Sequence, residues 1–108
     1  MFCVALLATH YSHAQECNSK VLLLGDSIGA GYGLATSESW AAMLAKELSQ
    51  GDVDFVNASV SGETTAGGLR RIHELLKRHK PALLIVELGG NDGLRGYPIA
   101  RMKKNLQA

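Results

Sequence analysis

Three short runs that read as β-strands constrain this chain more than any other feature. They occupy residues 20–24, 53–57 and 82–88, and each is followed by a glycine-rich loop and then by a segment with helical spacing. The first and third runs are almost wholly apolar, which is typical of strands buried on both faces of a parallel sheet. Strands that alternate with helices predict βαβ units with right-handed crossovers. The expected fold class is therefore α/β.

The segments between these runs each show one apolar stripe at helical spacing. Residues 40–48 carry apolar side chains at spacings of three, four and eight, and Gly51 is expected to end this helix. A second stripe covers residues 69–79 and stops at Pro81. A third helix is expected over residues 98–108, so that strand and helix alternate three times.

Length and composition exclude several classes of protein. The 108 residues suit one small domain, and 46% hydrophobic with 19% charged residues is too apolar for a disordered chain. A net charge of +1 argues against general nucleic-acid binding. No apolar run approaches the roughly 18 residues of a membrane span. Two cysteines allow at most one disulfide, so the fold is not built on disulfides.

The charge is distributed unevenly along the chain. Residues 1–66 carry two basic and seven acidic groups, whereas residues 67–108 carry nine basic and three acidic groups. The basic half is either an anion-binding surface or the solvated side of an amphipathic helix. We favour the second interpretation and expect four basic side chains to face outward from one helix. They are Arg70, Arg71, Lys77 and Arg78.

Residues 1–14 are expected to be a secretory signal peptide. A short apolar core at 2–8 precedes the small residues of S-H-A at 12–14, although no basic residue precedes the core. The alternative is a loosely packed N-terminal arm. Cleavage would remove Cys3 and leave Cys17 as an incidental thiol. The folded domain is then residues 15–108, in a periplasmic or secreted protein.

The first glycine-rich loop, Gly25–Gly33, places a serine directly after a buried strand. Ser27 is the candidate nucleophile, because small neighbours let a substrate carbonyl approach its hydroxyl. The alternative is a turn in which Asp26 or Ser27 caps backbone N–H groups. G-D-S-I-G also matches the elbow of α/β-hydrolases. The glycine spacing is not that of a dinucleotide loop, and no lysine follows, which excludes a P-loop.

The other two loops offer hydrogen-bond donors. Gly62 could present its N–H to a developing oxyanion, and Asn91 its side-chain amide. Asn57, at a strand end, could brace the loops, and Asp92 could hold the third loop by accepting backbone hydrogen bonds. The alternatives are ordinary turns: a glycine turn with a threonine helix cap, and a G-N-D-G turn.

Taken together, the three loops resemble the SGNH, or GDSL-type, hydrolase family. The matching blocks are G-D-S at 25–27, N-A-S-V-S-G-E-T-T at 57–65 and V-E-L-G-G-N-D-G-L-R-G at 86–96. The chain is most similar to the branch of periplasmic arylesterases, thioesterases and lysophospholipases. The resemblance covers residues 20–108 and carries the blocks in the family's order.

This resemblance implies a serine ester hydrolase that acts on small-molecule esters or thioesters, with no cofactor and no metal. Ser27 would be the nucleophile, and the oxyanion hole would comprise the Ser27 N–H, the Gly62 N–H and the Asn91 side chain. Asp26, Asn57 and Asp92 would support these groups. The implied fold is a flavodoxin-like three-layer α/β/α sandwich with a five-stranded parallel sheet, of which this chain supplies about three strands.

One block of the family pattern is missing from this chain. The family places D-x-x-H near its C-terminus, where His is the general base and Asp orients it, but no such motif occurs here. The four histidines are not expected to act as bases; they are His10, His13, His73 and His79. We therefore expect the N-terminal part of a longer enzyme, inactive or nearly so on its own.

Truncation would also affect stability, because the strand at 82–88 would form an exposed apolar edge. Marginal stability is expected for so short a domain.

Three other hypotheses remain at this stage. A non-catalytic binding module or pseudoenzyme would use the same loops to hold a carboxylate or acetyl group. An α/β-hydrolase is disfavoured because only one strand precedes Ser27. A nucleotide-binding flavodoxin-like domain is disfavoured by the spacing of the first loop.

Overall fold

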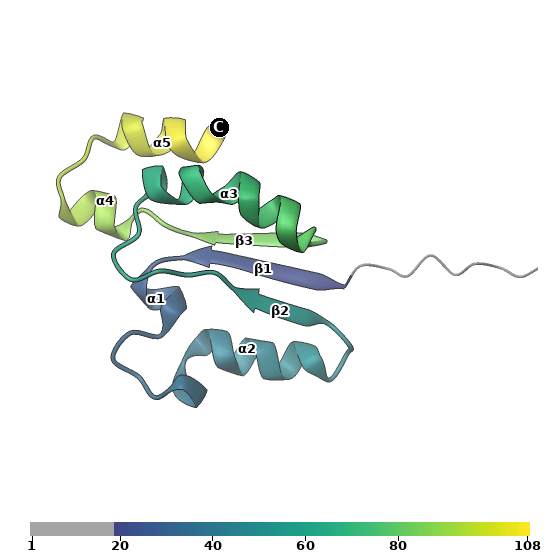
Figure 1. Cartoon of the computed structure of the whole chain (residues 1–108). Helices are drawn as coiled ribbons and strands as arrows, with labels where there is room; N and C mark the ends of the chain where they lie inside the picture. Colours follow the sequence, from purple (N-terminus) through teal and green to yellow (C-terminus); the bar gives the residue numbers. More distant parts are fainter. Residues whose placement is uncertain (1–18) are drawn as a thin grey trace, which may run out of the picture.

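A computed structural model describes residues 19–108, which form three layers (Figure 1). The middle layer is a parallel sheet of β1 (Lys20–Gly25), β2 (Asp54–Asn57) and β3 (Leu83–Glu87), in the order β2-β1-β3. Helix α2 (Trp40–Ser49) covers one face. Helices α3 (Thr65–His79) and α5 (Ile99–Gln107) cover the other. The expected α/β class and parallel sheet are confirmed, whereas the predicted signal peptide and Cys17 lie outside the described residues.

Strand β1 is the centre of the core, because it pairs with a neighbour on both sides. Leu22 lies opposite Val56 of β2 and Leu84 of β3. Leu22 and Leu23 are fully buried, on opposite faces of the strand. Burial on both faces explains why this run is uninterrupted by polar residues, since each buried leucine contributes about 1.5–3 kcal/mol.

The two long crossover helices begin at side-chain caps. The Ser39 hydroxyl accepts the Ala42 N–H at 3.1 Å, and the Thr64 hydroxyl accepts the Gly67 N–H at 3.1 Å. Helix α3 therefore starts four residues before the apolar stripe that predicted it. Its first turn approaches the sheet closely, and a Cβ at Gly68 would overlap the Leu88 side chain. Glycine in this turn therefore brings α3 close to the carboxyl end of the sheet.

Three short helices between the longer elements were not predicted. They are α1 (Ser27–Ala30), the 3₁₀ helix η1 (Thr36–Glu38) and α4 (Gly90–Leu94). One turn of helix is too short to show a hydrophobic period, so the sequence pattern carries no sign of them. Helices α1 and α4 both lie at the carboxyl end of the sheet (Figure 1).

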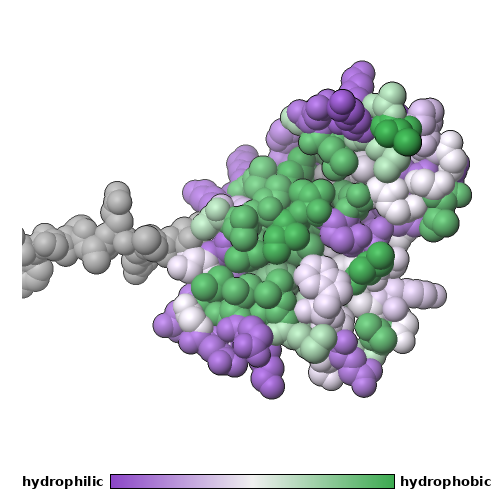
Figure 2. Space-filling view, turned by 180° about the vertical axis from the view of Figure 1, so that it is seen from behind, coloured by the Kyte–Doolittle hydropathy of each residue, from purple (hydrophilic) through white to green (hydrophobic). Residues whose placement is uncertain are grey.

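Strand β3 forms an exposed edge, as the sequence predicts. Its side chains Leu83 and Val86 are 55% and 46% exposed. The space-filling view from behind shows a broad apolar patch over the middle of the molecule (Figure 2). An apolar groove of about 240 Å³ between β3, α3 and α5 is lined by Leu76, Val86 and Leu106, among others. Within the described residues, no helix is long and apolar enough to span a membrane.

The open edge predicts self-association of the 108-residue chain. A lysine at an edge position should reduce strand pairing between molecules, because its charge would be desolvated there. We expect Leu83→Lys to shift sedimentation velocity profiles towards monomer across a concentration series. Met43→Lys, on α2 and 53% exposed, is the matched control and should leave the profile unchanged. Equal behaviour of the two variants would contradict a role for the β3 edge.

Candidate active site

The three glycine-rich loops meet at the carboxyl end of the sheet. Each follows the end of one strand, and the strands are adjacent in the order β2-β1-β3. Parallel strands end at the same edge, so residues more than sixty positions apart come into contact there. Hydrogen bonds from Asn57, Asn91 and Arg95 connect all three loops.

Ser27 is the first residue of α1, directly after the β1 strand and the buried Asp26. The Asp26 carboxylate accepts the Ile28 N–H at 2.9 Å and so caps this short helix. Trp40 of α2 donates its indole N–H to the Ile28 carbonyl at 3.0 Å and holds the helix from the other side. Ser27 itself is half-buried, and no hydrogen bond within residues 19–108 uses its hydroxyl.

Asn57, at the end of β2, connects the first and second loops. Its side-chain amide donates to the Gly29 carbonyl at 2.8 Å, and its side-chain oxygen accepts the Ser59 N–H at 3.0 Å. Both halves of the amide are thereby used, so that Asn57 contacts α1 and its own loop together.

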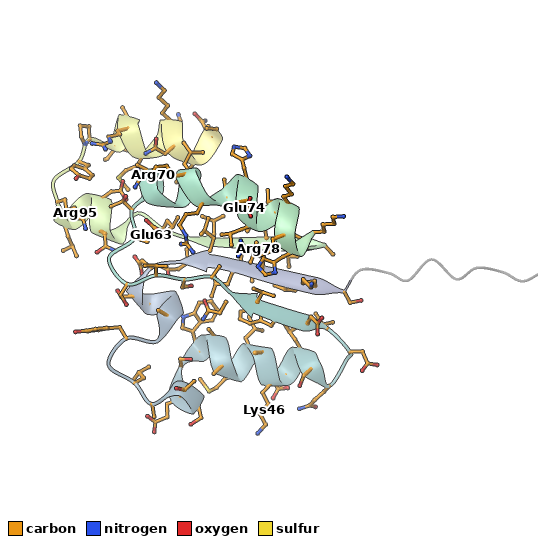
Figure 3. All side chains as sticks on the ribbon, in the orientation of Figure 1. Lys46, Glu63, Arg70, Glu74, Arg78 and Arg95 are labelled. Atoms are coloured by element: carbon orange, nitrogen blue, oxygen red, sulfur yellow. The ribbon has the colours of Figure 1, made fainter. Side chains whose placement is uncertain are left out.

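Gly62 lies exposed in the second loop, with a φ of +82°. A Cβ at this position would meet no atom within 4 Å, so the left-handed backbone and not lack of space favours glycine here. In the part of the chain that the structure describes, the Gly62 N–H donates to no acceptor. Its carbonyl accepts from the guanidinium of Arg95, the C-cap residue of α4, at 3.2 Å (Figure 3).

Asn91, in the third loop, contacts the other two. Its amide nitrogen donates to Asp26 Oδ2 at 3.2 Å and to the Glu63 carbonyl at 2.9 Å. Asp26 precedes Ser27 and Glu63 follows Gly62. The Asn91 amide is therefore held beside both of the other candidate donors.

Asp92 is fully buried and joins α4 to the start of α3. Its two carboxylate oxygens accept the Thr65 N–H at 2.8 Å and the Thr65 hydroxyl at 2.7 Å. Asn105 of α5 donates to the same hydroxyl at 2.9 Å. Burial acts to raise the pKa of Asp92, but the hydrogen bonds from Thr65 outweigh it and leave the pKa below its ordinary value.

The expectation that all four basic residues of α3 face solvent is wrong for Arg71. Its guanidinium is half-buried and donates to Glu63 Oε2 at 2.9 Å and to the Ala58 carbonyl at 2.8 Å. Figure 3 shows Glu63 beside the start of α3. Arg71 thus holds the second loop against the helix that follows it. The helical pattern could not show this, because the partners lie in an irregular loop.

Glu87 was not singled out from the sequence, since it reads as the polar end of an apolar strand. Its Oε2 accepts the Asp26 N–H at 3.2 Å and the Gly29 N–H at 3.1 Å. Burial raises the pKa of Glu87, and the nearby negative charge of Asp26 raises it further. The loop that carries Ser27 is therefore held by two carboxylates, those of Asp26 and Glu87.

The histidines of the described region lie away from the three loops, and its acidic side chains form no metal-binding cluster. His73 and His79, the histidines of the described region, both lie on α3, and neither is among the contacts of the three loops. Residues 19–108 contain no cluster of three or more side chains suited to a metal ion.

The parallel α/β sheet, with Ser27 after its central strand and Asn91 after a neighbouring strand, has the arrangement that the resemblance to the SGNH family predicts. The chain belongs to the GDSL-like lipase/acylhydrolase family, which it matches over residues 23–108.

Individual relatives agree with this assignment. The chain is 50% identical to the esterase TesA of Pseudomonas aeruginosa, over 96% of this chain and 51% of TesA. It is 46% identical to thioesterase 1/protease 1/lysophospholipase L1 of Escherichia coli K12, over 81% of this chain and 41% of that protein. The crystal structure of AlinE4, an SGNH-hydrolase family esterase, superposes with a TM-score of 0.74 at 46% identity, covering 82% of this chain and 49% of AlinE4. The chain thus spans about half the length of the relatives it matches.

Replacing Asp92 tests the link between α4 and α3. We expect Asp92→Asn to lower the free energy of unfolding by about 2 kcal/mol, because the amide cannot accept both Thr65 hydrogen bonds. Urea unfolding at pH 7 measures this loss, with Asp54→Asn at an exposed position of β2 as control.

The same variant tests the pKa of Asp92. A depressed pKa stabilises the fold above about pH 4, and this contribution is lost as the pH falls through the folded-state value. The difference between wild type and Asp92→Asn should therefore shrink below about pH 4. A difference that stays constant to low pH would show that ionised Asp92 contributes nothing.

Proposed function

We propose that the protein is a serine ester hydrolase that acts on small-molecule esters or thioesters through a Ser27 acyl-enzyme. The observation that carries this proposal is the Asn91 amide, which lies between Asp26 at 3.2 Å and the Glu63 carbonyl at 2.9 Å. These contacts gather the serine and both candidate oxyanion donors from three separate loops.

The reaction begins with attack of Ser27 Oγ on the substrate carbonyl carbon. The carbonyl oxygen becomes an oxyanion, which accepts hydrogen bonds from the Ser27 N–H, the Gly62 N–H and the Asn91 amide. Collapse of this intermediate expels the alcohol or thiol, and water then releases the acid from the acyl-enzyme. One such donor contributes about 10²–10³ in rate.

The three proposed oxyanion donors differ in whether they already have a hydrogen-bond acceptor in the described structure. The N–H groups of Ser27 and Gly62 have no acceptor within the described residues. The Asn91 nitrogen already has two acceptors, so it must exchange one of them to reach an oxyanion. The contact to Asp26 is the longer, and we assign it as the one that yields.

Exposed apolar side chains on the three loops support an ester substrate with apolar groups. Ile28 and Tyr32 lie in the first loop, Val60 in the second and Leu94 in the third, and all four are largely exposed. Together they offer contact area to an acyl or aryl group whose carbonyl enters between the donors.

Deprotonation of Ser27 requires a base. The described histidines are not placed for this role, and the family pattern assigns it to a D-x-x-H histidine. We place this base in the part of the relatives' length that the chain does not span. The supporting roles of Asp26, Asn57 and Asp92 are to hold α1, the second loop and α4.

We also propose that residues 1–14 direct the protein out of the cytoplasm, to the periplasm or the medium. The apolar core followed by S-H-A supports this assignment. N-terminal sequencing of the protein secreted by its host should begin near residue 15, and an intact Met1 would contradict it.

A non-catalytic module that binds a carboxylate or acetyl group is the alternative function. The unengaged Gly62 and Ser27 N–H groups favour it equally, since they would bind a carboxylate without turnover. Calorimetric titration with acetate in the absence of ester hydrolysis would support this alternative.

Replacing the nucleophile tests the proposal. In the protein as its source organism produces it, Ser27→Ala should reduce hydrolysis of a p-nitrophenyl ester by at least about 10³-fold, because no acyl-enzyme can form. Ser37→Ala, at an exposed position of η1, is the matched control and should retain activity. Unchanged hydrolysis in Ser27→Ala would overturn the proposed mechanism.

A further inference from the structure

Helix α1 has little stability of its own. It contains only the four residues Ser27–Ala30, and one turn of helix costs more conformational entropy than its hydrogen bonds return. The N–H groups of a first turn also lack acceptors inside the helix. The orientation of Ser27 must therefore be maintained by groups outside α1.

Two carboxylates supply most of these acceptors. Glu87 Oε2 accepts the N–H groups of Asp26 and Gly29, and Asp26 Oδ1 accepts that of Ile28. Of the four successive N–H groups at 26–29, only that of Ser27 lacks an acceptor within the described residues. The pattern leaves this one donor available to a ligand and engages each of its neighbours.

The surrounding space is adapted to the Glu87 carboxylate. A Cβ at Gly25 would lie 2.9 Å from Glu87 Oε2 and 2.8 Å from Ser59 Oγ, and a Cβ at Gly29 would overlap Ser59 Oγ. Neither glycine has a positive φ, so both are needed for space and not for backbone angle. The buried Ser59 hydroxyl makes no hydrogen bond among the described residues and lies in this same confined region.

We propose that Glu87 is a positioning residue, whose carboxylate fixes the first turn of α1 so that the Ser27 N–H and hydroxyl point towards the substrate. This inference rests on the proposed function, in which Ser27 is the nucleophile. Glu87 touches no reacting atom and acts through the backbone of Asp26 and Gly29. The carboxylate reaches them from β3, 61 and 58 residues away in sequence.

Three variants test the proposal in the protein as its host produces it. Glu87→Leu removes the acceptor and should lower kcat for p-nitrophenyl ester hydrolysis by about 10- to 100-fold, with KM little changed, because the serine is misplaced. Glu87→Gln keeps one acceptor oxygen and should restore kcat to within a few-fold of wild type. Glu47→Gln, on the exposed side of α2, is the control for loss of a carboxylate.

Stability must be measured beside activity. A merely structural Glu87 would lower the free energy of unfolding in Glu87→Leu without changing kcat of the folded enzyme, and this result would overturn the proposal. If Glu87→Leu does not fold, Glu87→Asp withdraws the carboxylate by one methylene and should show the same loss of kcat. Wild-type kcat in Glu87→Asp would then overturn it.

Amide NMR separates failure of this inference from failure of the proposed function. In ¹⁵N spectra of the protein as its host produces it, loss of the acceptor in Glu87→Leu should move the amide protons of Asp26 and Gly29 upfield and shift that of Ser27. Glu87→Gln should restore all three. If Ser27→Ala proves the hydrolase mechanism wrong, these spectra still decide whether Glu87 orients Ser27, and an unmoved Ser27 amide would contradict it.

Discussion

The Asn91 amide is the contact on which the arrangement of the site depends. It is bonded to the Asp26 carboxylate in the loop after β1 and to the Glu63 carbonyl in the loop after β2, while its own loop follows β3. Loops are the most mobile parts of an α/β domain, and three of them must keep a common geometry for their donors to converge. The Asn91 amide has acceptors in both other loops, and Asn57 and Arg95 add further hydrogen bonds between pairs of loops.

Four carboxylates crowd the carboxyl end of the sheet, and each is compensated by hydrogen-bond donors. Asp26 accepts from Ile28 and Asn91, and Glu87 accepts from two backbone N–H groups. Asp92 accepts from Thr65, and Glu63 pairs with Arg71. Backbone and amide donors carry no net charge, so the Asp26–Glu87 pair remains electrostatically unfavourable. Burial raises the pKa of Glu87 and the Asp26 charge raises it further, whereas the hydrogen bonds from Thr65 lower the pKa of Asp92.

The sequence pattern predicts the strands and longer helices much better than it predicts the side-chain contacts between loops. The strands and the three longer helices follow from apolar runs, stripes and caps, because these signals are local. Ser27, Gly62 and Asn91 could be selected because each lies in a loop directly after a strand. Glu87 could not, because its partners are about sixty residues away and its own run reads as a strand. The prediction for Arg71 was wrong for a related reason. The position of a residue along a helix shows which face of the helix it occupies, but it does not show that an irregular loop packs against that face.

The G-D-S-I-G block itself has a packing explanation beside the chemical one. In a nucleophile elbow, glycines permit a sharp turn from strand to helix around the serine. Here neither Gly25 nor Gly29 has a positive φ, and what they provide is room for the Glu87 carboxylate and the Ser59 side chain. The aspartate between them is both the cap of α1 and an acceptor for Asn91. Asp26 and Gly29 are thus held by Glu87 of β3, and Gly29 also by Asn57 of β2, which is why a four-residue helix can hold a serine in one orientation.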